Sequence, residues 1–123
     1  MAMKKKMLVY ALPEDRQRHL ADVMRELQIV VIPVPTTQYA QPLQTVIAEE
    51  TGHDKAFLWP EFTEPMLVMA GLESEDIDAV LAALKHNQIR IDLKAVVTPT
   101  NESWTSLQLY GELYREREAM RRG

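Results

Sequence analysis

The sequence predicts an α/β fold: a duplicated β-α-β-α unit that forms a four-stranded, mostly parallel sheet with helices on both faces. Short segments that are apolar throughout alternate with segments whose apolar residues recur at helical spacing. Strands that are apolar on both sides are typical of a parallel sheet covered by helices on both faces. A ferredoxin-like α+β sheet with extra helices is the alternative, because it also contains two βαβ units, in split form.

Composition limits the function classes. The chain has 123 residues, 46% of them hydrophobic, which suits a single domain over residues 1–123. The formal net charge of −4 argues against a protein whose main role is to bind nucleic acid. The chain has no cysteine, which excludes disulfides and suits a reducing compartment. No apolar run is long enough to span a membrane. We therefore expect a soluble cytoplasmic protein whose partners include neither nucleic acid nor a membrane.

The second half of the chain repeats features of the first half in the same order. Met7–Ala11 (MLVYA) reappears as Met66–Ala70 (MLVMA), and Gln28-Ile29 reappears as Gln88-Ile89. We predict two internal repeats, at about 7–52 and 66–121, joined by an apolar loop at 53–65.

The first repeat is predicted to run strand, helix, strand, helix. Met7–Leu12 is the first strand, and the acids after Pro13 favour the first turn of a helix. That helix has one apolar stripe, formed by Leu20, Val23, Met24 and Leu27. Ile29–Val34 is the second strand, and the next helix begins near Pro42 and ends near Gly52.

The second repeat follows the same plan. Met66–Ala70 is predicted as a strand, and Ser74 as the N-cap of a helix that ends near His86. The alternation that begins at Ile89 predicts a strand with one exposed face, and the last helix is expected from Asn101 onward.

The junction after that strand is the candidate ligand site. Thr and Asn at a helix start accept hydrogen bonds from free backbone N–H groups, so simple capping explains them. The same N–H groups can instead bind an anion, at the strand end where open α/β sheets bind ligands. The candidate residues for an anionic small molecule are Lys94, Thr98, Thr100, Asn101 and Trp104.

The loop between the repeats is too apolar to be left in water. Phe57, Trp59 and Phe62 either fold over the core or form an interaction patch. The same loop carries His53, which we read as a surface residue because no catalytic or metal-binding partner can be named for it from spacing. Glycine-rich phosphate loops and the nucleophile elbow are absent, so we expect no cofactor, no metal and no catalytic residue.

One stretch also resembles a known family. The string from Leu93 to Asn101 (LKAVVTPTN), with Trp104 after it and Met66–Leu72 before it, is similar to a bacterial family known as domain of unknown function 3783. The match is strongest from Glu64 to the C-terminus and looser over the first half. Members often end in an acidic helix, whereas residues 115–122 here mix Arg and Glu. The resemblance implies a small bacterial protein and assigns no activity.

Three functional hypotheses follow. The first is a small non-catalytic regulatory or protein-interaction module that binds itself, as a homodimer, or another protein. The second is a binding protein for an anionic small molecule at Lys94 and the Thr98–Asn101 junction. The third is an enzyme that uses the His53 loop.

Overall fold

The computed structural model describes residues 4–49 and 62–122. The elements are, in chain order, β1 (Lys6–Tyr10), α1 (Glu14–Arg25), β2 (Val30–Pro33), the short 3₁₀ helix η1 (Thr36–Gln38), α2 (Leu43–Ile47), β3 (Met66–Ala70), α3 (Ser74–His86), β4 (Leu93–Val96) and α4 (Ser106–Arg122). The α-helices and strands of the described residues confirm the predicted α/β class.

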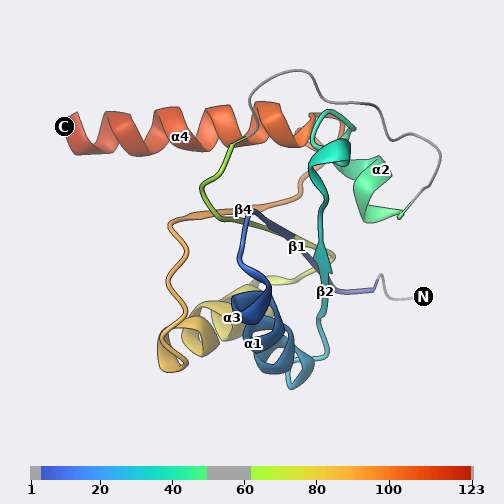
Figure 1. Cartoon of the computed structure of the whole chain (residues 1–123), viewed down its shortest axis with the longest axis vertical. Helices are drawn as coiled ribbons and strands as arrows, with labels where there is room; N and C mark the ends of the chain where they lie inside the picture. Colours follow the sequence, from blue (N-terminus) through green and yellow to red (C-terminus); the bar gives the residue numbers. More distant parts are fainter. Residues whose placement is uncertain (1–3, 50–61, 123) are drawn as a thin grey trace.

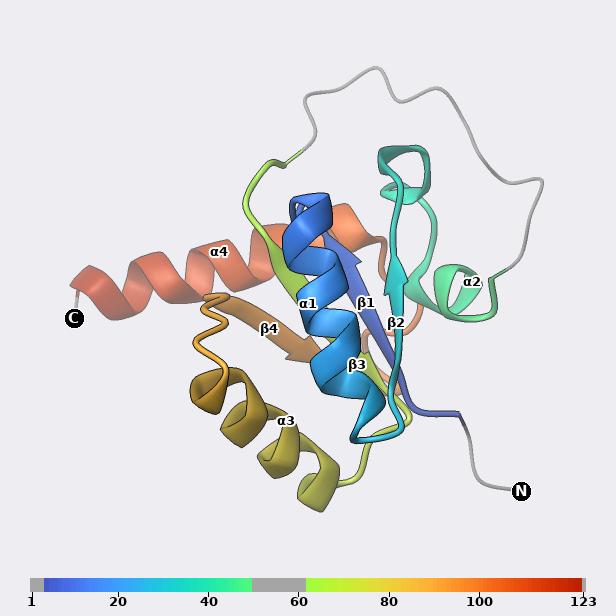
Figure 2. The ribbon, with the colours of Figure 1, turned by 60° about the horizontal axis from the view of Figure 1, so that its bottom comes forward.

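The four strands form one sheet in the order β2-β1-β3-β4 (Figure 2). β1 pairs with β2 in parallel and β3 with β4 in parallel, but the central pair β1–β3 is antiparallel, with Leu8 opposite Val68. The sheet is therefore mixed, and the prediction of a mostly parallel sheet was wrong. β2 lies directly beside β1, so the βαβ units are also not split as in a ferredoxin-like sheet.

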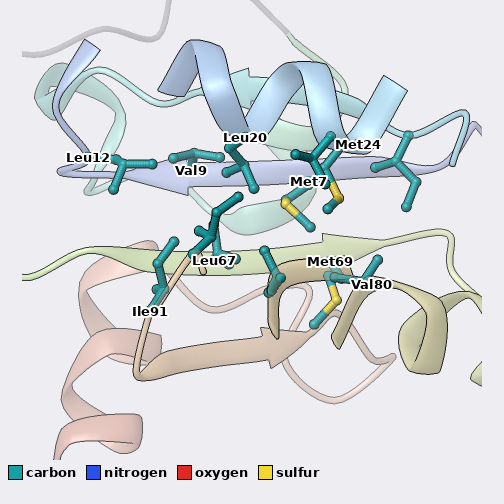
Figure 3. Packing of buried hydrophobic residues seen from close by; sticks show 13 residues of the cluster. Met7, Val9, Leu12, Leu20, Met24, Leu67, Met69, Val80 and Ile91 are labelled. Atoms are coloured by element: carbon teal, nitrogen blue, oxygen red, sulfur yellow. The ribbon is translucent and has the colours of Figure 1, made fainter. Parts of the chain in front are cut away.

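Helices cover both faces of the sheet (Figure 1). On one face, α1 and α3 pack against alternate residues of the two central strands, including Met7 and Leu67 (Figure 3). The core on this face combines the α1 stripe with the α3 stripe: Leu20, Val23 and Met24 from α1, and Val80 and Leu84 from α3. Strand alternation explains this, because successive side chains point to opposite faces.

The opposite face holds the second core, beneath α2, η1 and α4. Leu8 and Tyr10 of β1 and Met66 and Val68 of β3 point to this side. They pack against Tyr39, Leu43, Val46 and Leu109, all of which are buried. Both faces of β1 and β3 are therefore buried, which is why these strands are apolar throughout.

Three element boundaries differ from the sequence prediction. Glu73, not Ser74, is the N-cap of α3, in a reciprocal capping box with Asp76. The second strand of the second repeat is only Leu93–Val96, although Ile89 and Ile91 ahead of it are buried in the core. The last helix begins at Ser106 instead of Asn101, because an irregular turn separates it from β4.

The two βαβ units share local conformations at matched positions. Ala11 and Gly71 follow their strands with φ of 58° and 76°, and Gln28 and Gln88 lie just after α1 and α3 with φ of 59° and 56°. In both pairs, 11 with 71 and 28 with 88, the two residues are the same number of positions apart along the chain. This separation matches Met7 with Leu67 and not with Met66. Met7 and Leu67 indeed lie in the same core. This likeness supports a duplication, which stays a prediction.

No helix in the described ranges is long and apolar enough to cross a membrane.

Candidate functional site

The predicted junction is a self-contained turn. The backbone N–H of Thr98 donates to Asn101 Oδ1 (2.8 Å), and the backbone N–H of Asn101 donates to Thr98 Oγ1 (3.2 Å). The Asn101 side-chain amide also donates to the carbonyl of Val96 at the end of β4 (3.1 Å). The Glu102 N–H donates to the Thr98 carbonyl (3.0 Å). These backbone donors are already occupied, so an anion would have to displace the protein's own acceptors. Thr100 is exposed in this turn.

Lys94 lies away from that turn, in the middle of the edge strand β4. Its ammonium donates to the carbonyl of Ile91, three residues earlier. It lines a cavity of about 660 Å³ beside the C-terminal half of α3, together with Lys85, Arg90 and Asp92. A lysine on an edge strand discourages pairing with another strand, which gives Lys94 a structural role that needs no ligand.

Trp104 lies apart from both the Thr98–Asn101 turn and Lys94. Its backbone carbonyl accepts the N–H of Leu43 (2.8 Å), which ties the start of α2 to the segment before α4. Its half-buried side chain packs against the second core and borders a shallow groove of about 400 Å³. This α4 groove is lined by Trp104, Leu107, Gln108, Gly111, Glu112 and Arg115. Lys94, Thr98 and Trp104 thus line three different cavities, whereas Thr98 and Asn101 share one turn.

Phe62 contributes to the interior and not to an exposed patch. Only 8% of its surface is exposed, and its ring stacks between Tyr39 (centroids 4.5 Å apart) and Tyr110 (4.3 Å). This aromatic stack joins η1 to α4 across the second core. Phe57, Trp59 and His53 lie outside the described residues. Within the described ranges, no group of three His, Cys, Asp or Glu side chains is placed to hold a metal ion.

Two polar contacts, both missed by sequence reasoning, fix α4 on the sheet. At its start, the hydroxyl of Tyr10 and Oγ of Ser106 are 2.7 Å apart, and both residues are 0% exposed. Burial raises the pKa of Tyr10 above its usual range. Tyr and Ser at unrelated positions carry no spacing signal, so only the fold reveals the pair.

Near its end, α4 is held by Arg117. The guanidinium makes two hydrogen bonds to Glu64, just before β3, one from Nη1 and one from Nη2 (2.9 Å). Asp92 Oδ2 lies 3.9 Å from the same guanidinium, which also stacks over the Tyr114 ring at 5.5 Å. These hydrogen bonds hold the pKa of Glu64 below its usual range and raise that of Arg117.

The largely apolar cavity that contains Thr98 lies at the carboxyl ends of β3 and β4. Its volume is about 600 Å³, and we call it the sheet-end cavity. Its walls come from the start of β1, the end of α2, the segment after β3 and the turn after β4: Lys4, Lys6, Gln44, Ile47, Ala48, Ala70, Gly71, Leu72, Val97, Thr98, Pro99 and Glu102.

Comparison with known families confirms the resemblance read from the sequence. The family model described as domain of unknown function (DUF3783) matches residues 65–120, which contain β3, α3, β4 and most of α4. The searches of curated proteins and of solved structures found no match. The matched range covers the second βαβ unit and its α4, with both α4 contact residues Ser106 and Arg117.

Proposed function

We propose that the protein is a small non-catalytic interaction module that forms a homodimer, in which the α4 grooves of two copies pack against each other. The observation that carries this proposal is the groove itself. Leu109 and Leu113 of α4 pack on the second core, and Trp104 and Leu107 contact both that core and the groove. The groove is completed by Gln108, Gly111, Glu112 and Arg115.

The shape of the groove favours a second helix. Gly111 lines it, and apart from its chain neighbours and the adjacent backbone of α4, no described atom stands within 4 Å of the position that a Cβ on Gly111 would take. A glycine in the middle of a helix destabilises it by about 0.5–1 kcal/mol relative to alanine. Close packing of a second helix against Gly111 offsets this cost. Trp104 and Leu107, both half-buried, supply apolar surface on the same side.

The charges of the groove favour a copy of the same chain. Glu112 and Arg115 lie one turn apart and form an ion pair of 2.6 Å within the helix. In a two-fold dimer, a residue i that contacts residue j of the second copy implies the reverse contact as well. An antiparallel second α4 that crosses near these residues can therefore exchange two internal ion pairs, one in each copy, for two ion pairs between copies. The groove is complementary to itself.

Light scattering across a concentration series tests the proposal. The native chain is expected to reach twice its 14.1 kDa mass, and Gly111→Lys to remain a monomer because the lysine side chain fills the groove. The matched control is Ala82→Lys, at an exposed position of α3, which should dimerise like the native chain. A native chain that stays at 14.1 kDa throughout, or a Gly111→Lys variant that dimerises equally well, contradicts the proposal.

A charge swap supplies a rescue experiment. Glu112→Arg alone sets like charges against each other in the dimer and should weaken it. Glu112→Arg with Arg115→Glu restores complementarity and should restore the dimer. If the single and double variants dimerise to the same extent, these charges play no part in the contact.

A further inference from the structure

We propose that the sheet-end cavity binds a small organic carboxylate with an aliphatic body. Its position is the first argument. Open α/β sheets bind ligands beyond the carboxyl ends of parallel strands, and β3 and β4 are a parallel pair that ends here. Its volume of about 600 Å³ falls within the range of about 300–1,000 Å³ that is usual for small-molecule sites.

The lining gives the chemical class of the ligand. Ile47, Ala70, Leu72, Val97 and Pro99 provide an apolar wall. At the β1 side stand Lys4 and Lys6, whose ammonium groups attract an anion. Such a combination of an apolar wall with one cationic side suits an aliphatic chain that ends in a carboxylate.

Lys6 is the anchor of this arrangement. Its side chain is 16% exposed, and its ammonium donates to the carbonyl of Ile47 at the end of α2 (2.6 Å). A second proton of the ammonium group is donated to the carboxylate of Glu49, which lies 3.3 Å away and whose side chain is 60% exposed. A ligand carboxylate can take the place of this loosely held side chain. Glu102, also in the lining, disfavours anions and lies in the turn after β4.

The cavity beside α3 is the weaker anion site, although it contains Lys85, Arg90 and Lys94. It lies at the C-terminal end of α3, where the helix dipole favours cations. Lys94 already donates to the Ile91 carbonyl, and Arg90 lies 3.9 Å from Asp92. The sequence prediction placed the anion at Lys94 together with the Thr98–Asn101 junction; Thr98 lines the sheet-end cavity, whereas Lys94 lines the cavity beside α3.

Octanoate is the probe, with octanamide as its uncharged counterpart. Titration of the full chain by NMR is expected to shift the backbone signals of Ala48, Gly71 and Thr98, and calorimetry gives the affinity. Lys4→Met, at an exposed position, should weaken octanoate binding, and Lys6→Met should weaken it about tenfold, the usual effect of one charge-assisted hydrogen bond. Glu49→Gln should strengthen binding about two- to fivefold, because a partly exposed competitor is removed.

Lys94→Met is the matched control and should leave octanoate binding unchanged. Should Lys6→Met fail to fold, Lys4→Met and Glu49→Gln still carry the test. The proposal is overturned if octanoate shifts none of the cavity signals, if octanamide binds as tightly as octanoate, or if Lys94→Met weakens binding as much as Lys4→Met.

Discussion

Removing the hydroxyl of Tyr10 should destabilise the protein far more than the small size of this group suggests. Tyr10 and Ser106 form a hydrogen bond of 2.7 Å and are both 0% exposed. Tyr10→Phe therefore leaves a buried serine hydroxyl without its partner, at a cost of about 1–3 kcal/mol. Ser106→Ala likewise leaves the tyrosine hydroxyl without its partner, although the higher helix propensity of alanine partly offsets this cost.

The double substitution should be milder than the sum of the two single ones. Replacing both hydrogen-bonding partners with apolar groups is close to neutral, whereas orphaning one partner is costly. We expect a coupling free energy of about 1–2 kcal/mol between positions 10 and 106.

Urea denaturation followed by circular dichroism measures these differences for all four members of the cycle. Tyr114→Phe is the matched control, since Tyr114 is 43% exposed and should change stability by less than about 0.5 kcal/mol. A Tyr10→Phe variant as stable as the native chain, or additive effects in the double variant, would refute the reasoning.

The Tyr10–Ser106 pair also predicts that the stability of the protein falls at alkaline pH. Burial raises the folded-state pKa of Tyr10 above its unfolded value of about 10. Tyr10 therefore stays protonated to a higher pH in the folded protein than in the unfolded chain. The stability that this difference contributes is complete below a pH of about 10 and is lost as the pH rises toward the folded pKa. The native chain should lose stability faster than Tyr10→Phe in this range; parallel curves would show that the hydroxyl is not desolvated.

Three further predictions concern other contacts of the structure. Gly111→Ala should raise monomer stability by about 0.5–1 kcal/mol in urea denaturation, because alanine is the better helix former and its methyl group meets open space; a loss of stability would show a close neighbour. Asn101→Ala should cost about 1–2 kcal/mol, because it removes the cap of the turn and the bond to β4, whereas the exposed Thr100→Ala should be nearly neutral; equal effects would contradict the capping role. Arg117→Gln should return the lowered pKa of Glu64 toward its usual value in a carboxyl NMR titration, and should remove the stability that the native chain loses as pH falls through the folded pKa of Glu64; an unchanged titration curve would refute this ion pair.

Local patterns were sufficient to predict most elements. β3 has the predicted bounds, and three of the four residues of the predicted α1 stripe, Leu20, Val23 and Met24, are buried in a core. Strand direction was not predictable in this way. β1 and β3 are apolar on both sides because helices cover both faces, and this pattern is the same whether the two strands run parallel or antiparallel.

The candidate site was predictable only in part. Thr98 and Asn101 were predicted to cap a helix; they do exchange hydrogen bonds, but within a turn, and α4 begins only at Ser106. Lys94 was grouped with it because the two are near in sequence, but Lys94 and Thr98 line different cavities. Lys6 and Ile47, which border the sheet-end cavity with Thr98, come from distant parts of the chain. Their approach depends on the antiparallel placement of β3 beside β1, which no local pattern records.

Disulfide trapping tests the proposed α4 contact most directly. The chain has no cysteine, so Gly111→Cys introduces a single thiol in the lining of the α4 groove. We predict that mild oxidation of folded Gly111→Cys gives a covalent dimer much faster than it does for Ala82→Cys, a control at an exposed position of α3. Equal rates for the two variants, or no covalent dimer from Gly111→Cys, would contradict a homodimer formed through α4.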